Sequence, residues 1–201
     1  YWINRFDREG NTAYIGCMTI RPILRAGHPV LRLTAAPVTD SDVSEIALLV
    51  EDMYDSMCDA GGAGIAAPQI GVSLRVVIFE IPAYRLDEGE DAIPLQVLIN
   101  PTIEPLGDEV ALGWEGCLSL PGMRGEVPRP ARIRYTGLDL DGQLIDRTVE
   151  GFHALVVQHE VDHLDGILYP GRMTDMSRFG FTQELVEGGV CTLPVPPSDD
   201  D

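Results

Sequence analysis

Hydrophobic positions recur with helical spacing in an early segment of the chain and in a late one. Between residues 43 and 57, apolar side chains return every three or four positions, as on the buried face of an amphipathic helix. The polar residues at 40–42 offer helix N-caps, and the glycines at 61–62 are expected to end this helix. Residues 151–164 predict a second helix, which is rich in apolar side chains and is therefore expected to be buried.

Two apolar runs between these helices have the composition of β-strands. Residues 74–81 are rich in Val, Ile and Phe, and residues 95–100 form a second run, which Pro101 is expected to close. The polar and acidic residues 82–94 between the two runs are predicted to be a loop.

A third and a fourth strand are predicted as a hairpin. Residues 132–140 alternate apolar and polar side chains, as in a half-buried strand, and the pair Asp141-Gly142 then favours a tight turn into residues 144–149. The order helix, strands, helix predicts an α+β fold, with mainly antiparallel sheets around the buried late helix. No internal repeat or second domain is visible.

The composition is that of a folded protein with a strong acidic excess. Of the 201 residues, 45% are hydrophobic and 23% are charged, while 14 basic residues stand against 32 acidic ones, for a net charge of -18. This charge argues against direct binding of nucleic acid or of an anionic membrane along the chain. All the basic residues are Arg, so a lysine Schiff base and a P-loop lysine are excluded.

The ends of the chain differ from its middle. Residues 1–17 are expected to be an extension, native or introduced by cloning, residues 18–187 the functional domain, and residues 188–201 a flexible acidic tail. No run approaches the roughly 18 apolar residues of a membrane span, so no membrane partner is expected.

Four scattered cysteines without a C-x-x-C pair favour a reducing compartment over a disulfide scaffold.

The most informative segment is Q-H-E-V-D-H, residues 158–163. His159 and His163 are four positions apart, so on a helix both rings project from one face and can share one metal ion. Glu160 lies beside them, where its carboxylate can reach a water molecule at the metal. His153 precedes this motif and is interpreted as a packing or surface residue.

Two histidines leave a metal ion without a full set of protein ligands. No His follows His163, and the downstream acids Glu184 and Glu187 lie close to the predicted flexible end. Upstream, Cys117 lies in E-G-C-L-S, where a neighbouring glycine allows close backbone approach. A Cys-His-His set with an open fourth position would be a catalytic metal site.

A third segment, G-A-G-I-A-A-P-Q, follows the first predicted helix. Its small residues suit an edge to which a peptide backbone comes close, and Gln69 could donate its side-chain amide to a developing oxyanion. By itself this segment would be interpreted as an ordinary glycine-rich turn.

Together the three segments resemble the motifs of peptide deformylases, which read G-φ-G-φ-A-A-x-Q, E-G-C-L-S and Q-H-E-x-D-H. The first matches residues 62–69, except that Ala63 is smaller than the usual branched residue, and the other two match residues 115–119 and 158–163 fully. The similarity runs from about Ile20 to about Leu185. Three motifs in the right order are far more specific than any one of them.

The resemblance implies that the chain removes the formyl group from the N-terminal formylmethionine of new polypeptides and releases formate. Glu160 would act as general base, and the side-chain amide of Gln69 and the backbone N–H of Leu118 would stabilise the oxyanion. The cofactor would be one divalent metal ion, Fe(II) in the cell, with Zn or Ni as alternatives in isolated material. Its ligands would be Cys117, His159 and His163.

The resemblance also implies residues around the substrate and behind the metal ligands. The methionine side chain would lie against Phe152, Leu155 and Val156, and the peptide backbone would lie near Ala63, Gly64 and Gly116. Three charged residues are expected to orient the metal ligands from behind: Glu115, Arg129 and Asp162.

The expected partners are N-formyl-methionyl nascent peptides. Transient proximity to the ribosome is consistent with this role, but the acidic tail is a poor ribosome-docking element. A monomer in a bacterial cytoplasm is the simplest setting, and an organellar or phage-encoded origin stays open.

Two other functions stay open at this point. An H-E-x-x-H metallopeptidase would cleave internal peptide bonds, but it lacks a good downstream ligand and gives no role to Cys117 or Gln69. A catalytically silent peptide-binding relative would be expected to lose Glu160, Gln69 or a metal ligand, and none of these is lost.

Overall fold

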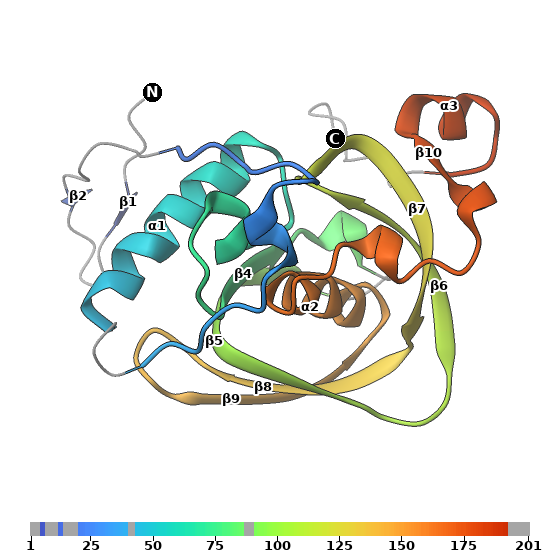
Figure 1. Cartoon of the computed structure of the whole chain (residues 1–201). Coiled ribbons are helices and arrows are strands. Elements are labelled where there is room, and N and C mark those ends of the chain that lie inside the picture. The colour runs from blue at the N-terminus through green and yellow to red at the C-terminus, as the bar shows by residue number, and fades with distance from the viewer. Residues whose placement is uncertain (1–4, 7–11, 14–19, 40–42, 87–90, 193–201) are drawn as a thin grey trace.

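The computed structural model describes most of the chain and shows helices packed on two antiparallel sheets (Figure 1). The residues described are 5–6, 12–13, 20–39, 43–86 and 91–192. The N-caps expected at residues 40–42 therefore lie outside the described residues. Near the N-terminus, β1 (Arg5–Phe6) and β2 (Thr12–Ala13) pair with each other.

The larger sheet has five strands in the order β3-β4-β5-β8-β9, and every neighbouring pair is antiparallel. The predicted hairpin is confirmed: its two strands pair in continuous register, and Gly142 takes the positive φ that its turn requires. The strands are β3 (Gly64–Ala66), β4 (Val76–Ile81), β5 (Ile93–Pro105), β8 (Arg132–Leu138) and β9 (Leu144–Glu150).

Strand β4 explains why a helix lies on each face of this sheet. Its residues are almost all apolar, and successive side chains point to opposite faces of a strand. Val77 and Phe79 belong to the core that contains α2 (Gly151–Leu164), whereas Val76 and Ile78 belong to the core that contains α1 (Val43–Asp59). Figure 1 shows α2 at the centre of the molecule. Both predicted helices and the α+β class are confirmed.

The smaller sheet has the order β10-β7-β6. The sequence analysis predicted no strand between residues 101 and 131, and that omission was wrong. Strand formers are diluted there by glycine and proline, which strands usually avoid. The elements are β6 (Val110–Cys117), β7 (Leu120–Pro130) and β10 (Phe179–Phe181), with the short helix α3 (Thr182–Glu187) after them.

Strand β5 does not end at Pro101 as predicted. It continues to Pro105, because an irregularity in its pairing with β8 between Ile99 and Thr102 accommodates the proline. Asn100 takes a positive φ of 51° there, and its side-chain amide bonds both the N–H and the C=O of Val38 at 2.9 Å. The segment predicted as a loop also contains structure, since β5 already begins at Ile93.

Short 3₁₀ helices connect several of these elements: η1 (Pro29–Arg32), η3 (Ala67–Ile70), η4 (Ala83–Arg85), η5 (Tyr169–Gly171) and η6 (Met176–Arg178). Among the described residues, no helix combines the length and the apolar character that crossing a membrane requires. The domain boundaries at residues 17 and 187 stay predictions, because residues 193–201 and most of 1–17 lie outside the described parts.

Candidate metal centre and active site

Helix α2 carries charged and polar side chains into the interior. From Ala154 to Leu164 all its residues are buried except Leu155, which is partly buried. His159, Glu160 and His163 are 8%, 5% and 1% exposed. Burying such a row of polar groups costs folding free energy unless each group has a hydrogen-bond partner or a functional role.

Cys117 ends β6, at the tight turn into β7. Its Sγ lies 3.3 Å from Nε2 of His163 and accepts a bond from the backbone N–H of Ser119 at 3.4 Å. The ligand atoms of Cys117, His159 and His163 all lie within 4.8 Å of one another. The structure thus brings together the three metal ligands expected from the sequence, from a strand end and a helix that are distant along the chain.

This donor set fits a divalent metal ion. A thiolate and two imidazoles are ligands for Zn, Fe and Ni, with bonds of roughly 2.0–2.3 Å. Oε2 of Glu160 and Nδ1 of His163 are buried without a hydrogen-bond partner among the described residues. An unpaired carboxylate oxygen beside three clustered ligands is understandable where a metal ion and a water molecule bind.

Burial sets the charge of the groups on this helix. It raises the pKa of Glu160 to about 7, and it lowers the pKa of His163, which favours the neutral, metal-binding imidazole. Burial also opposes protonation of His159, but its bonds to Cys117 and Glu115 outweigh burial and raise its pKa. A metal ion would compete with that proton.

A network of ion pairs between charged side chains lies behind His159. Oε2 of Glu115 is 2.7 Å from Nδ1 of His159, which leaves Nε2 of that ring for a ligand. Arg129 donates two bonds to Glu115, of 2.7 and 3.0 Å, and a third to Asp162 at 2.6 Å. Burial raises the pKa of Glu115, but the bonds from His159 and Arg129 outweigh it and lower that pKa below its usual value.

Arg172 completes this network of ion pairs and was not predicted from the sequence. It follows η5 and donates to both oxygens of Asp162, at 2.6 and 3.1 Å. No motif contains it, so only the folded structure reveals that it lies next to Asp162. Of the three charged residues named from the sequence, Glu115 contacts His159, and Arg129 joins Glu115 to Asp162.

Gln69 lies on η3, facing the turn that holds Cys117. Its Oε1 accepts the N–H of Ala66 at 2.8 Å, so its Nε2 donates on the other side, to Ser119 Oγ at 3.2 Å and Cys117 Sγ at 3.6 Å. The bond to Ala66 fixes which end of the amide faces the cluster. Leu118 lies in the same turn, directly after the cysteine. Ser119 is a second neighbour that the sequence analysis did not single out.

A cavity of about 410 Å³ opens beside this cluster. All six substrate-binding residues expected from the sequence line it: Ala63, Gly64, Gly116, Phe152, Leu155 and Val156. At Gly64 a side chain would overlap the carboxylate of Glu160. At Gly113 a Cβ would lie 2.5 Å from the side chain of Leu155. These glycines therefore leave room for side chains of α2.

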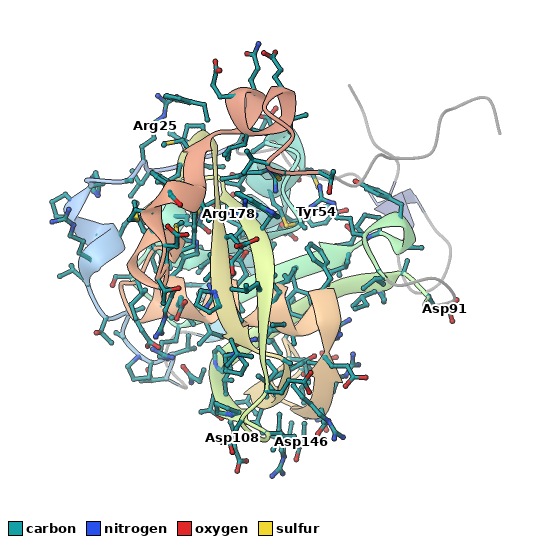
Figure 2. All side chains as sticks on the ribbon, turned by 90° about the vertical axis from the view of Figure 1, so that its right-hand side faces the viewer. Arg25, Tyr54, Asp91, Asp108, Asp146 and Arg178 are labelled. Atoms are coloured by element: carbon teal, nitrogen blue, oxygen red, sulfur yellow. The ribbon has the colours of Figure 1, made fainter. Side chains whose placement is uncertain are left out.

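The cavity is also lined by residues that the sequence analysis did not single out, among them Trp114, Arg124 and Arg85. Trp114 is held from outside by Arg178, whose guanidinium lies 4.8 Å from the ring centroid and is paired with Glu126. Figure 2 looks onto this side of the molecule, with Arg178 beside β6 and β7 and with Asp108 and Asp146 at the lower end.

His153 is outside the metal-binding group, as expected. Its ring packs against Phe79 and Tyr135, with centroids 5.5 and 5.7 Å away, and its Nε2 is 3.3 Å from the hydroxyl of Tyr135. Burial, followed by the charge of Arg147, lowers the pKa of His153 to about 4.

The depressed pKa of His153 predicts a loss of stability in mild acid. The pKa is 6.5 in an unfolded chain and about 4 in the fold. The unfolded state therefore binds more protons between these values, and stability falls as the pH decreases from about 6.5 to about 4. At pH 5 this loss is roughly 1 kcal/mol, because water around the partly buried ring screens part of the effect, and His153→Gln should abolish it. Urea unfolding at pH 7.5 and pH 5 measures the difference.

The control for this experiment is His28→Gln, which removes an exposed histidine. It should lose as much stability as the unaltered protein between the two pH values. An equal loss in His153→Gln would show that His153 does not contribute to the acid sensitivity.

Comparisons with known proteins agree on one family. A family model described as polypeptide deformylase matches residues 20–179. Peptide deformylase 2 of Ralstonia nicotianae is 58% identical over 166 residues, which are 83% of this chain and 94% of the relative. Peptide deformylase 1 of Nitrosomonas europaea is 52% identical over 169 residues, 84% of this chain and 96% of the relative.

Solved structures give the same result. The Met-Ala-Ser-bound class I type b peptide deformylase from Acinetobacter baumannii has a TM-score of 0.70 and 37% identity, covering 78% of this chain and all 100% of that one. Peptide deformylase from Thermotoga maritima has a TM-score of 0.68 and 35% identity, over 78% of this chain and 99% of that one.

Proposed function

The chain belongs to the polypeptide deformylase family, and we propose that Cys117, His159 and His163 hold the divalent metal ion on which its activity depends. The reaction is hydrolysis of the formyl group at the N-terminal formylmethionine of new polypeptides, with release of formate. The observation that carries the assignment of ligands is the clustering of one thiol and two imidazoles within 4.8 Å. When bound, the ion supplies Lewis-acid chemistry, lowering the pKa of water and polarising a carbonyl oxygen.

Glu160 acts as the general base in this proposal. Burial raises its pKa to about 7, so near neutral pH the carboxylate can both accept a proton and give it up again. It takes a proton from water and returns it to the departing amine. Gly64 supports this role, since the missing side chain leaves the carboxylate open to the cavity.

Gln69 and Leu118 stabilise the oxygen on which negative charge develops. The side-chain amide of Gln69 is fixed by its bond to Ala66 before any substrate binds, and such preorganised donors are the effective ones. The backbone N–H of Leu118, in the turn after Cys117, is the second donor. Glu115, Arg129 and Asp162 hold the ring of His159 in its ligand orientation.

The peptide binds between two edge strands. Strand β3 is the outer strand of the larger sheet and β6 that of the smaller one, and both contribute glycine to the cavity wall. An extended peptide can pair with such an edge through its backbone. Its methionine side chain then lies against Phe152, Leu155 and Val156.

Formate release tests this function. We expect formyl-Met-Ala-Ser to release formate, a chelator to abolish the release, and added Fe(II), Ni or Zn to restore it. Cleavage of internal peptide bonds would instead indicate a metallopeptidase. Peptide binding without turnover at saturating metal would indicate a silent relative.

Fe(II) is the proposed metal in the cell, with Zn or Ni in isolated material. The thiolate ligand supports this, since an Fe(II)–thiolate site is sensitive to oxidation and exchanges its metal during aerobic handling. Metal analysis of protein purified with and without oxygen should show iron only in the anaerobic sample. Zinc in both samples would contradict the proposal.

The proposed setting is a bacterial cytoplasm, where formylated nascent chains are made. Bacterial relatives support it, and the acidic net charge of -18 supports a monomer that meets the ribosome only transiently, without binding nucleic acid. An organellar or phage origin is the alternative, and a probable deformylase from Synechococcus phage S-SSM7 has a TM-score of 0.66.

A further inference from the structure

Two arginines in the cavity wall, Arg85 and Arg124, have no acidic partner among the described residues, and Arg85 lies over the ring of Tyr84. Arg124 lines the cavity, and no described carboxylate lies within ion-pair distance of it, although the chain has 32 acidic and 14 basic residues. Six of the other described arginines form ion pairs: Arg21, Arg75, Arg129, Arg134, Arg172 and Arg178. Arg124 therefore has a guanidinium available to a ligand.

Two glycines leave this guanidinium beside the active site. In the register of the smaller sheet, Arg124 pairs with Gly116 of β6 on one side and Gly180 of β10 on the other. The central carbon of the guanidinium is 3.5 Å, and Nη1 is 3.6 Å, from the position that a Cβ of Gly116 would take. The charge thus lies over the residue that precedes Cys117.

The nearby acids of the cavity are already engaged or lie deeper. Glu115 is bonded to Arg129 and His159, and Glu160 is 5% exposed on α2. Glu126, the other acid close by on β7, is paired with Arg178. A carboxylate on a bound peptide can therefore pair with Arg124. The positive charge of Arg124 is uncompensated, and its planar guanidinium offers a bidentate set of donors.

The placement of the peptide limits where that carboxylate can be. An extended chain advances about 3.3 Å per residue, and neighbouring side chains point to opposite faces. A peptide whose backbone runs along Gly116 brings the one or two residues after its methionine within reach of Arg124. Their side chains are the variable part of a formylmethionyl substrate.

We propose that Arg124 makes this deformylase select peptides with an Asp or Glu at the second or third position. The proposal rests on the proposed function, because that function places the peptide in this cavity. An arginine–carboxylate pair in a partly exposed site contributes enough to change binding about three- to fivefold. The preference should appear mainly in KM, since the contact is the same in substrate and transition state.

The test uses C-terminally amidated peptides, so that no terminal carboxylate interferes. Formyl-Met-Asp-Ala-amide and formyl-Met-Ala-Asp-amide are each compared with the matching Asn peptide, which has the same shape without the charge. We expect at least one Asp peptide to have a kcat/KM about three- to fivefold above its Asn partner. In Arg124→Gln the Asp peptide and its Asn partner should have equal kcat/KM values.

A matched variant separates local recognition from net charge. Arg32→Gln removes the same charge from an exposed arginine on η1 that does not line the cavity, and it should keep the full preference. Equal kcat/KM values for Asp and Asn peptides in the unaltered protein would overturn the proposal. A preference that survives in Arg124→Gln, or disappears in Arg32→Gln, would overturn it as well.

Binding of the deformylated peptides keeps this test independent of catalysis. Dissociation constants of Met-Asp-Ala-amide, Met-Ala-Asp-amide and their Asn counterparts are measured by calorimetry for the same three proteins. If no peptide is turned over, the proposed function fails, and an Asp preference in binding that Arg124→Gln removes still supports the role of Arg124. Equal binding of Asp and Asn peptides contradicts that role even if turnover is normal.

Discussion

Replacing Glu160 with glutamine is expected to lower kcat for formate release by about 10²–10⁴-fold, the range that a positioned general base contributes. Glutamine has nearly the same shape, but it cannot accept and return a proton. The metal content should not change, because the proposed ligands Cys117, His159 and His163 are untouched. Steady-state kinetics and metal analysis of one protein sample measure both effects.

The Glu160→Gln substitution is not expected to lower the stability of the folded state. Burial raises the pKa of Glu160 to about 7, which means that the fold disfavours its charged form. A neutral amide at this position should leave the unfolding temperature unchanged or raise it at pH 8. Glu184→Gln on the exposed face of α3 is the control, with kcat unchanged. Normal turnover by Glu160→Gln would eliminate Glu160 as the base.

The parts of the fold that were predicted correctly are those whose signal is local. The bounds of α2 were predicted as found, since the glycine at its start and its long apolar run lie within one segment. The hairpin of β8 and β9 follows from strict alternation around one turn signal. The neighbouring histidines of the metal site share one helix, so their spacing alone places them together.

The missed parts depend on contacts between distant segments. Strands β6 and β7 contain many glycines and prolines, which lower local strand propensity, and it is their pairing with each other that makes them strands. The glycines that weaken the local signal are needed for packing, as Gly113 of β6 makes way for Leu155 and Gly125 of β7 for Met173.

The candidate site shows the same division. Cys117 was suggested by the need for a third ligand, by its neighbouring glycine and by the E-G-C-L-S motif, and its distance from His163 comes from the fold. Arg172 contacts Asp162 and belongs to no motif, whereas Ser119 lies within E-G-C-L-S but had no predicted role. Charge partners that only the tertiary structure brings together are therefore the hardest part of a site to predict from the sequence.

The ion-pair network behind the metal ligands predicts the largest effect on stability. The side chains of Arg129, Glu115 and Asp162 are 6%, 0% and 8% exposed, and Arg129 is the cation that joins the two carboxylates. In Arg129→Met both acids stay buried, and Glu115 loses its arginine partner. Removing one partner of a buried pair costs about 3–5 kcal/mol. In a chain of this length, the unfolding temperature should fall by roughly 6–20 °C.

A second substitution distinguishes a lost charge partner from simple loss of packing. If the cost comes from uncompensated carboxylates, Arg129→Met combined with Glu115→Gln should be more stable than Arg129→Met alone, because one buried charge is removed. Arg134→Met breaks exposed ion pairs with Asp146 and Glu104, which water screens, and should lower the unfolding temperature far less than Arg129→Met. All four proteins are compared by thermal unfolding at saturating metal, since bound metal itself adds stability. If the double variant is no more stable than Arg129→Met, the penalty comes from lost packing, and the charge argument for this network fails.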